Sequence, residues 1–424
     1  HAKLFKTSTQ ISTAQGKQWS LASLKSFSFV HAADLHLGYA QYGLEIRRQD
    51  FDDAFKELVD KTIELKPDFM IIAGDLFHQA RPSNHTLENT IRSFKRLKDA
   101  GIPVLTVDGS HDSAPNTITS TILYPLDSAG LIIHLPRHQG ACWSKENCCY
   151  VYGIPTYHNR HKTQEALPKF MEDNPPTPKV GVANIFVLHG ALDLPGVKGP
   201  FEAEILPDEL PGGFCYYAAG HLHERYISNF KDGILVYSGS TETVSYDEAK
   251  YLKGFYLVKV DEKGQVKPEI IELTSPRKFV IMAEQDFTGM ISAKITELAV
   301  QMVKDADEEG AVIIPVLKGT LPSEASRTEI DISKIRNAGE RALLVHPVIL
   351  LKETAVSDEI VRSIFESGFK DFKTKAFEYF QQIFSDRYGK DEAEKIARGA
   401  LSLIEPLARK QDDKVKQAIE ELAR

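Results

Sequence analysis

The chain has 424 residues, of which 42% are hydrophobic and 26% charged, and its formal net charge is −8. This length exceeds one ordinary domain and predicts two or three. No apolar run approaches the roughly 20 residues that a membrane-spanning helix needs, so the composition predicts a soluble globular protein with no membrane partner. The negative charge gives no support to a nucleic-acid partner, although such a partner needs only a local basic face.

Neither the cysteines nor the first residues indicate secretion. Four cysteines are too few for a disulfide framework in a chain of this size, so free thiols in a reducing compartment are expected. Residues 1–25 are rich in Ser, Thr, Gln and Lys and lack the apolar stretch of a secretory signal. We expect this segment to be a flexible tail or a cloning remnant, with the fold beginning near Phe27.

Strands and helices alternate in the first part of the chain. The expected elements are a strand from Phe27 to Ala33, a helix from Arg47 to Leu65, a strand from Asp68 to Ala73, a helix from Thr86 to Ala100 and a strand from Ile102 to Val107. After residue 130, short apolar runs separated by turn residues predict strands near 131–133, 150–154, 185–188, 216–219, 234–237 and 255–260. The pattern is typical of an α/β domain over residues 26–275, with two packed mixed β-sheets flanked by helices.

The pattern changes at residues 274–276, where Thr, Ser and Pro end the series of strands. Residues 276–352 combine strand-like runs at 312–317 and 349–351 with helical stretches near 291–304 and 332–340, which predicts a small α+β domain. Residues 353–424 are helix-like throughout, with a capping pair at Asp391 and Glu394 before a second helix and a break at Pro406. An aromatic-rich stripe is made of Val361, Phe365, Phe372, Ala376, Phe380 and Ile383.

Nearly all the chemical signal lies in five short segments, each of which follows a predicted strand. They are Asp34-Leu35-His36, Gly74-Asp75-Leu76-Phe77, Gly109-Ser110-His111-Asp112, His189-Gly190 and Gly220-His221-Leu222-His223. On an extended chain, residues at i and i+2 point to the same face, so Asp-x-His and His-x-His can each hold one metal ion. The neighbouring glycines permit tight turns and a close approach of phosphate to the backbone.

The residue types in these segments favour transition metals. Imidazole and carboxylate together suit Mn, Fe or Zn better than Mg or Ca, which prefer oxygen ligands. One carboxylate between two ions commonly holds them about 3.5–4 Å apart, and Asp75 is central in the order of the segments. A lone His189 is more often a buried structural histidine, but five such segments in order indicate a two-metal site.

The order of the segments resembles the calcineurin-like metallophosphoesterase superfamily. Within it, four longer stretches resemble the DNA double-strand-break repair nuclease of the meiotic-recombination-eleven/SbcD type, in its archaeal form. These stretches are ADLHLGY at 33–39, GDLFHQARPS at 74–83, YAAGHLHE at 217–224 and YSGSTE at 237–242. The resemblance covers residues 27–275 strongly, and it implies the two-sheet fold of that superfamily, with a capping domain at 276–352.

The resemblance also implies residue roles and a cofactor. Two Mn²⁺ ions are expected, although other divalent transition metals fit the same ligands. The first ion would be held by Asp34, His36, Asp75 and His223, and the second by Asp75, the residue at position 110, His189 and His221. His111 would lie just outside the metals and act on the transition state or the leaving oxygen, with Asp112 orienting it.

One position departs from the family pattern. The family motif is Gly-Asn-His-Asp, whereas this chain has Ser110 between Gly109 and His111. A Ser hydroxyl is shorter than an Asn amide and a poorer neutral ligand, so the second metal is expected to bind more weakly. Both a natural and an introduced replacement are compatible with the sequence.

The implied activity is Mn²⁺-dependent nuclease action on duplex DNA ends, as 3′–5′ exonuclease and endonuclease. Candidate contacts to DNA phosphates are the aromatic and basic residues near the first two segments, namely Tyr39, Tyr42, Arg47, Arg48 and Arg81. The alternative for Arg47 and Arg48 is a solvated helix face.

The implied partners are a second copy of the chain and an ATPase. The ATPase would be of the SMC-like ABC type, related to SbcC, and would dock on the helices of residues 353–424, unless their aromatic stripe packs on the protein's own core. The homodimer would use Arg81 to Lys98, unless that helix only covers the sheet. A cytoplasmic, nucleoid-associated location in a prokaryote follows.

Two other functions remain open at this point. A metallophosphodiesterase for small substrates would share all five segments, although it would not need the extra domains. A DNA-binding scaffold with impaired catalysis would follow if Ser110 has cost the second metal.

Overall fold

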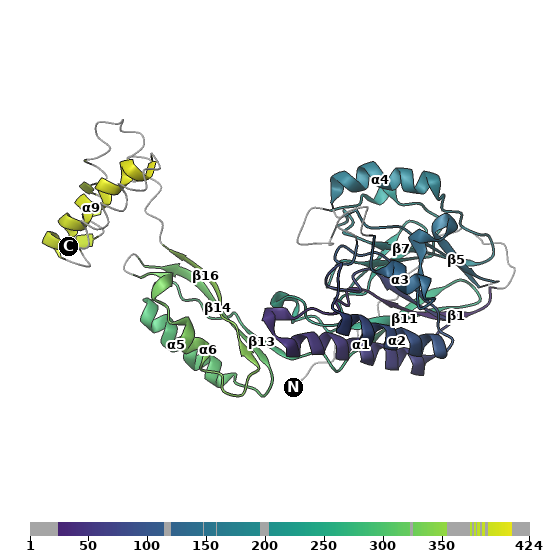
Figure 1. The fold of residues 1–424 in the computed structure, drawn as a ribbon, viewed down its shortest axis with the longest axis horizontal. Coiled ribbons are helices and arrows are strands. Elements are labelled where there is room, and N and C mark those ends of the chain that lie inside the picture. Colours follow the sequence, from purple (N-terminus) through teal and green to yellow (C-terminus); the bar gives the residue numbers. More distant parts are fainter. Residues whose placement is uncertain are drawn as a thin grey trace. The chain divides into compact units, whose positions relative to one another are not determined.

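The computed structural model describes residues 24–113, 120–146, 148–157, 159–195, 203–322, 325–353 and 389–408, with isolated positions between 374 and 385. The chain divides into two compact units, His1–Arg277 and Lys278–Arg424. Figure 1 shows the fold in chain order, and each unit is described by itself. Among the helices in the described part of the chain, none combines the length and apolar character that crossing a bilayer requires.

The first unit contains two six-stranded mixed sheets packed face to face. One sheet has the order β12 (Val266–Glu272), β11 (Gly254–Val260), β1 (Phe27–Ala32), β2 (Phe69–Ala73), β3 (Val104–Val107) and β4 (Ile133–His134). The other has the order β5 (Cys142–Lys145), β6 (Cys149–Gly153), β7 (Ala183–His189), β8 (Tyr216–Gly220), β10 (Gly233–Tyr237) and β9 (Tyr226–Phe230). The site segments follow or end strands β1, β2 and β3 of the first sheet and strands β7 and β8 of the second. The pairs β1–β2, β2–β3 and β7–β8 are parallel.

Helices cover the outer faces of both sheets (Figure 1). Helices α1 (Glu45–Leu65) and α2 (Asn84–Asp99) lie on one side, α4 (Arg160–Asp173) lies on the other, and α3 (Leu123–Ser128) is a short connection. Alternation along β1 builds the layers, because Val30 packs with α1 and α2 while Phe29 packs between the two sheets. The predicted α/β class with two packed mixed sheets is therefore confirmed.

Helix α4 was not predicted, because the region after residue 130 was expected to contain mostly strands. Its amphipathic signal is weak, since only Thr163 and Leu167 are buried and Pro168 lies inside the helix. The short strands β5 and β9 and the edge strand β12 were also missed. Edge strands bury little surface on one side, so their apolar pattern is diluted.

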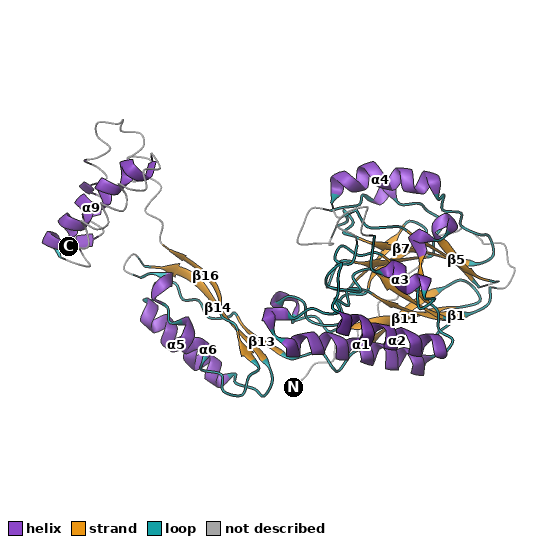
Figure 2. Ribbon diagram, in the orientation of Figure 1, coloured by secondary structure: helices purple, strands orange, loops and turns teal. Residues whose placement is uncertain are grey.

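The second unit has a four-stranded parallel sheet with helices on one face (Figure 2). Its strands are β13 (Phe279–Met282), β14 (Val312–Leu321), β15 (Leu344–Val345) and β16 (Val348–Glu353), and its helices are α5 (Ser292–Asp305) and α6 (Ile332–Arg336). The predicted strands at 312–317 and 349–351 and the predicted helices are present. Helix α6 is shorter than expected, because the chain leaves the helix at Asn337.

Helix α9 (Lys390–Ala408) contains both Asp391 and Pro406. The predictions of a capping pair before this helix and of a break at Pro406 are therefore wrong. Within the aromatic stripe, Phe380 is described and half-buried. The stripe positions Val361, Phe365, Phe372, Ala376 and Ile383 lie outside the described residues.

Candidate metal centre

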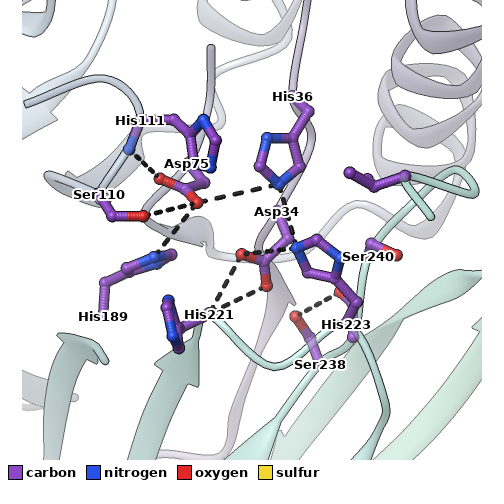
Figure 3. A network of polar contacts seen from close by, with 12 residues as sticks. Asp34, His36, Asp75, Ser110, His111, His189, His221, His223, Ser238 and Ser240 are labelled. Carbon is purple, nitrogen blue, oxygen red and sulfur yellow. Dashed lines mark hydrogen bonds and ion pairs between the residues drawn. The ribbon is translucent and has the colours of Figure 1, made fainter. Parts of the chain in front are cut away.

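The five segments converge at the carboxyl ends of the parallel strands of both sheets (Figure 3). Asp34 follows β1 and Asp75 follows β2, while His189 ends β7 and His221 follows β8. Parallel strands direct their carboxyl ends to the same edge, so segments more than 180 residues apart in sequence meet there.

The backbone at this edge adopts left-handed conformations. The φ angles of Asp34, His36, Asp75 and His221 are 55°, 46°, 50° and 97°. Non-glycine residues rarely hold such angles, and the strain is concentrated at functional sites. The expectation that Asp-x-His and His-x-His hold metals from an extended backbone is therefore wrong in detail, since the ligands lie in turns just beyond the strands.

Two glycines are required by close approach to the candidate ligands. A Cβ atom on Gly109 would lie 2.0 Å from both the backbone N and the Oδ1 of Asp75. A Cβ on Gly74, whose φ is +85°, would lie 2.3 Å from His189 Nδ1. These contacts are far shorter than atoms tolerate, so the glycines let neighbouring ligand loops pack against one another.

The first cluster of candidate ligands contains Asp34, His36 and His223, with one ligand atom of each within 4.8 Å of the others. His36 Nε2 is 3.1 Å from His223 Nε2, and His223 Nε2 is 4.0 Å from Asp34 Oδ1. Two imidazole nitrogens this close are compatible with bonds of about 2.1 Å to one shared ion.

The second cluster contains Asp34, Asp75 and His189 under the same distance limit. Asp75 Oδ2 lies 3.4 Å from His189 Nε2 and 3.8 Å from His36 Nε2. This carboxylate oxygen therefore faces both clusters, as a bridging ligand must.

Ser110 and His221 border the second cluster. Ser110 Oγ donates a hydrogen bond to Asp75 Oδ2 at 3.4 Å. The ring of His221 packs edge-on against that of His189, with centroids 5.3 Å apart. The backbone N–H of His221 donates to Asp34 Oδ1 at 3.0 Å, which fixes the carboxylate between the clusters.

A family model for calcineurin-like phosphoesterases matches residues 27–225. This region therefore has the calcineurin-like phosphoesterase fold. The chain is also similar to proteins named DNA double-strand break repair protein Mre11, which confirms the expected resemblance. The relative from Methanocaldococcus jannaschii is 35% identical over 54% of this chain and 62% of its own length. Those from Archaeoglobus fulgidus and Thermoplasma acidophilum are 27% and 29% identical, over 73% of this chain and over 72% and 81% of their own lengths.

The phosphoesterase fold implies divalent metal ions, and the donor set fits them. His189 Nδ1 donates to the carbonyl oxygen of Ala73 at 2.9 Å, which leaves a lone pair on Nε2. That Nε2 is buried and has no hydrogen-bond partner. A buried polar atom without a partner is costly unless a ligand completes it. His223 is arranged alike, since its Nδ1 donates to Glu248 Oε1 at 2.6 Å.

Opposite charges shift one another inside the phosphoesterase centre. Burial raises the pKa of Asp34 and lowers that of His36 well below its ordinary value. Burial would also raise the pKa of Asp75, but His189 holds it well below its ordinary range. Conversely, burial would lower the pKa of His189, but Asp75 raises it to about 10. Without a metal, His189 therefore carries a proton on Nε2; a cation bound at that atom would displace the proton and supply the counter-charge to Asp75 in its place.

His111 is exposed beside the first cluster, with its ring centroid 4.8 Å from that of His36. Its backbone N–H donates to Asp75 Oδ1 at 2.8 Å, and its Nδ1 lies 3.0 Å from the carbonyl oxygen of His78. The loop is thus anchored through the backbone, while the imidazole is held at the rim of the phosphoesterase centre.

Asp112 does not orient the ring of His111 as expected. Its buried carboxylate accepts hydrogen bonds from the backbone N–H groups of Gly109 and Leu76, each at 2.7 Å. Burial and the nearby carboxylates of Asp75 and Asp108 raise the pKa of Asp112 to about 8. Asp112 therefore ties two ligand loops together, and the carbonyl of His78 is the partner of the His111 ring.

Two residues of the centre were missed by sequence reasoning. His78 stacks on Tyr39 with centroids 3.8 Å apart, and its Nδ1 is 3.4 Å from His36 Nδ1. His78 lies three residues after Asp75, within the stretch GDLFHQARPS at 74–83, so the sequence alone could have indicated it. Glu248 bonds His223 from 25 residues further along the chain, and no local pattern marks it.

The residues expected to contact DNA differ in how far solvent reaches them. Arg47 is 0% exposed and donates to Asp50 and Glu242, while Arg48 is buried and donates to Glu45 and Asp52. Both the phosphate contact and the solvated helix face are therefore wrong for these two arginines, because acidic partners already hold each guanidinium inside the domain. Tyr39 and Tyr42 are half-buried, and Arg81 is exposed.

Proposed function

We propose that the chain is a two-metal phosphodiesterase, a Mn²⁺-dependent nuclease that processes DNA ends. The observation that carries this proposal is the pair of overlapping ligand clusters that share Asp34 and face Asp75 Oδ2. The phosphoesterase domain match supports phosphoester chemistry. The similar archaeal proteins are named for DNA double-strand break repair, which supports DNA as the substrate.

In this proposal the two ions share the carboxylate of Asp75, and Asp34, which belongs to both ligand clusters, is assigned to the first ion. The first ion is assigned to Asp34, His36, Asp75 and His223, and the second to Asp75, Ser110, His189 and His221. When bound, two such ions stabilise charge on a phosphoryl group and lower the pKa of a bound water. His111, exposed at the rim, is the group proposed to take up charge on the phosphoryl or leaving oxygen.

The DNA would approach from the side of His111. Tyr39 and Arg81 remain candidates for phosphate contacts, together with Tyr42.

We propose both 3′–5′ exonuclease and endonuclease activity, and a cytoplasmic, nucleoid-associated location. Release of mononucleotides from end-labelled duplexes and nicking of circular DNA distinguish the two activities.

The decisive experiment compares the unaltered chain with Ser110→Asn in Mn²⁺ binding and in cleavage of duplex DNA. An amide reaches further than the Ser hydroxyl, which now donates to Asp75. We expect about two ions per chain and DNA cleavage in both proteins. We expect the weaker ion to bind roughly 10-fold more tightly in Ser110→Asn, a usual effect of changing one group around a metal. Ser144→Asn, at an exposed position of β5, is the control and should match the unaltered chain.

Other outcomes of this comparison identify the two rival functions. One bound ion, with cleavage only in Ser110→Asn, would show a DNA-binding scaffold whose second site is lost. Turnover of a small chromogenic diester without cleavage of DNA would show a small-substrate phosphodiesterase.

We further propose that residues 353–424 bind an SMC-like ABC ATPase of the SbcC type. Helix α9 is amphipathic, with buried Ala393 and Ala397 on one face and an exposed Arg398–Glu394 pair on another. We expect deletion of residues 355–424 to abolish capture of the ATPase in a pull-down, while Mn²⁺ binding by the phosphoesterase domain persists. Undiminished capture would contradict this docking proposal.

A homodimer through Arg81 to Lys98 is a separate proposal. Helix α2 buries Phe94 and Leu97 in its own domain and leaves Ile91 38% exposed on another face. Sedimentation of the full chain as a monomer at micromolar concentration would contradict it.

A further inference from the structure

His223 is enclosed by a ring of four hydrogen bonds. Its Nδ1 donates to Glu248 Oε1 at 2.6 Å, and Lys253 Nζ donates to Glu248 Oε2 at 3.2 Å. Lys253 Nζ also donates to Ser240 Oγ at 2.8 Å, and the backbone N–H of Ser240 donates to the carbonyl oxygen of His223 at 3.3 Å. The ring therefore fixes both the imidazole and the backbone of this candidate ligand (His223 and Ser240 in Figure 3).

The ring contains a buried charge pair. Glu248 is 9% exposed and Lys253 is 6% exposed. Burying charges costs free energy even when they are paired, and an apolar pair of the same size is often as stable. A charge pair at this position is therefore better explained by an effect on its neighbour than by stability. That neighbour is the imidazole of His223, whose Nε2 points to His36 and Asp34.

In the second cluster, the hydrogen-bond partner of the corresponding histidine, His189, is weaker. His189 Nδ1 donates to a neutral backbone carbonyl, that of Ala73. His223 Nδ1 donates to a carboxylate at a distance 0.3 Å shorter, 2.6 Å against 2.9 Å. A carboxylate behind an imidazole fixes its tautomer and makes it a more basic metal ligand. The two clusters therefore offer histidines of unequal strength.

We propose that Glu248 and Lys253 are positioning residues that make the Asp34–His36–His223 site the tighter of the two metal sites, so that it fills first. This inference rests on the proposed function, because it requires two divalent ions. Glu248 acts through His223. Lys253 acts through Glu248 and through Ser240, and keeps the carboxylate charged and oriented inside the domain.

The test is a Mn²⁺ titration of the metal-stripped full chain, followed by calorimetry and by the loss of the free-ion signal in electron paramagnetic resonance. Glu248→Gln keeps one acceptor oxygen for His223 and removes the charge, and its amide nitrogen can no longer accept a hydrogen bond from Lys253. We expect it to weaken the tighter binding event by roughly 10- to 100-fold, the usual effect of losing such a partner, and to leave the weaker event unchanged. Lys253→Met keeps an unbranched side chain that is one heavy atom shorter and uncharged, and it should weaken the same event.

Asp247→Asn is the matched control, because it removes the same charge from an exposed neighbour of Glu248. It should leave both binding events unchanged. Thermal unfolding of the metal-stripped proteins reports on the fold, and a positioning role predicts transitions like that of the unaltered chain for Glu248→Gln. Lys253→Met supplies the second test if Glu248→Gln does not fold.

Equal weakening of both binding events, or of neither, would overturn the inference while the proposed function stands. The failure of the proposed function has a different signature, which is the absence of any Mn²⁺ binding by the unaltered chain. That result would overturn both.

Discussion

Replacing Asp75 by Asn is expected to remove tight Mn²⁺ binding at both sites and to reduce DNA cleavage to background. Asp75 Oδ2 faces His36 Nε2 at 3.8 Å and His189 Nε2 at 3.4 Å, so its charge serves both clusters. Loss of a supporting partner alone weakens metal affinity about 10- to 100-fold, and we expect loss of a shared ligand to exceed this range. Calorimetric titration with Mn²⁺ and a duplex-end cleavage assay measure the two effects.

The fold should survive this change. The Asn side-chain oxygen can still accept the hydrogen bond from the backbone N–H of His111, which Asp75 Oδ1 now accepts at 2.8 Å. Asp60→Asn is the control, because that carboxylate is exposed and pairs only with Arg96 among the ion pairs of the described residues. Retention of two tightly bound ions in Asp75→Asn would show that this carboxylate is not the bridge.

Asp75 also shows how much of the site can be predicted from the sequence. The order of the five segments and the strand before each were sufficient to collect Asp75 with its partners at one edge of the sheets. The reason given for the spacing was incomplete, because Asp34, His36 and Asp75 have positive φ angles. Such turns are stabilised by contacts with other loops, for example the close packing of Gly109 on Asp75, and local sequence does not report those contacts.

Long-range partners account for the other errors. Arg47 lies in the first turn of α1 and carries a charge, so its local sequence is that of a solvated position. It is buried because Glu242, 195 residues away, and Asp50 compensate its charge. Glu248 was not predicted for the same reason, since its contact with His223 depends on the path of the chain between β10 and β11. Periodicity reports which face of an element is apolar, but not which charge another loop supplies.

Replacing His111 by Ala is expected to lower the turnover of DNA cleavage roughly 10²- to 10⁴-fold, the range of general acid–base catalysis. Mn²⁺ binding should remain as in the unaltered chain, because the link from His111 to Asp75 runs through the backbone N–H rather than the imidazole. The separation of these two readouts is what distinguishes a catalytic imidazole at the rim from a metal ligand.

The control for this variant is His138→Ala, which removes another exposed imidazole, one that pairs with Asp127. It should leave both cleavage and Mn²⁺ binding unchanged. An unchanged cleavage rate in His111→Ala would contradict the catalytic role, and a parallel loss of Mn²⁺ would instead make His111 part of the metal site. The position of the ring argues against the second outcome, since His111 is exposed at the rim, whereas the candidate ligands His36 and His189 are buried.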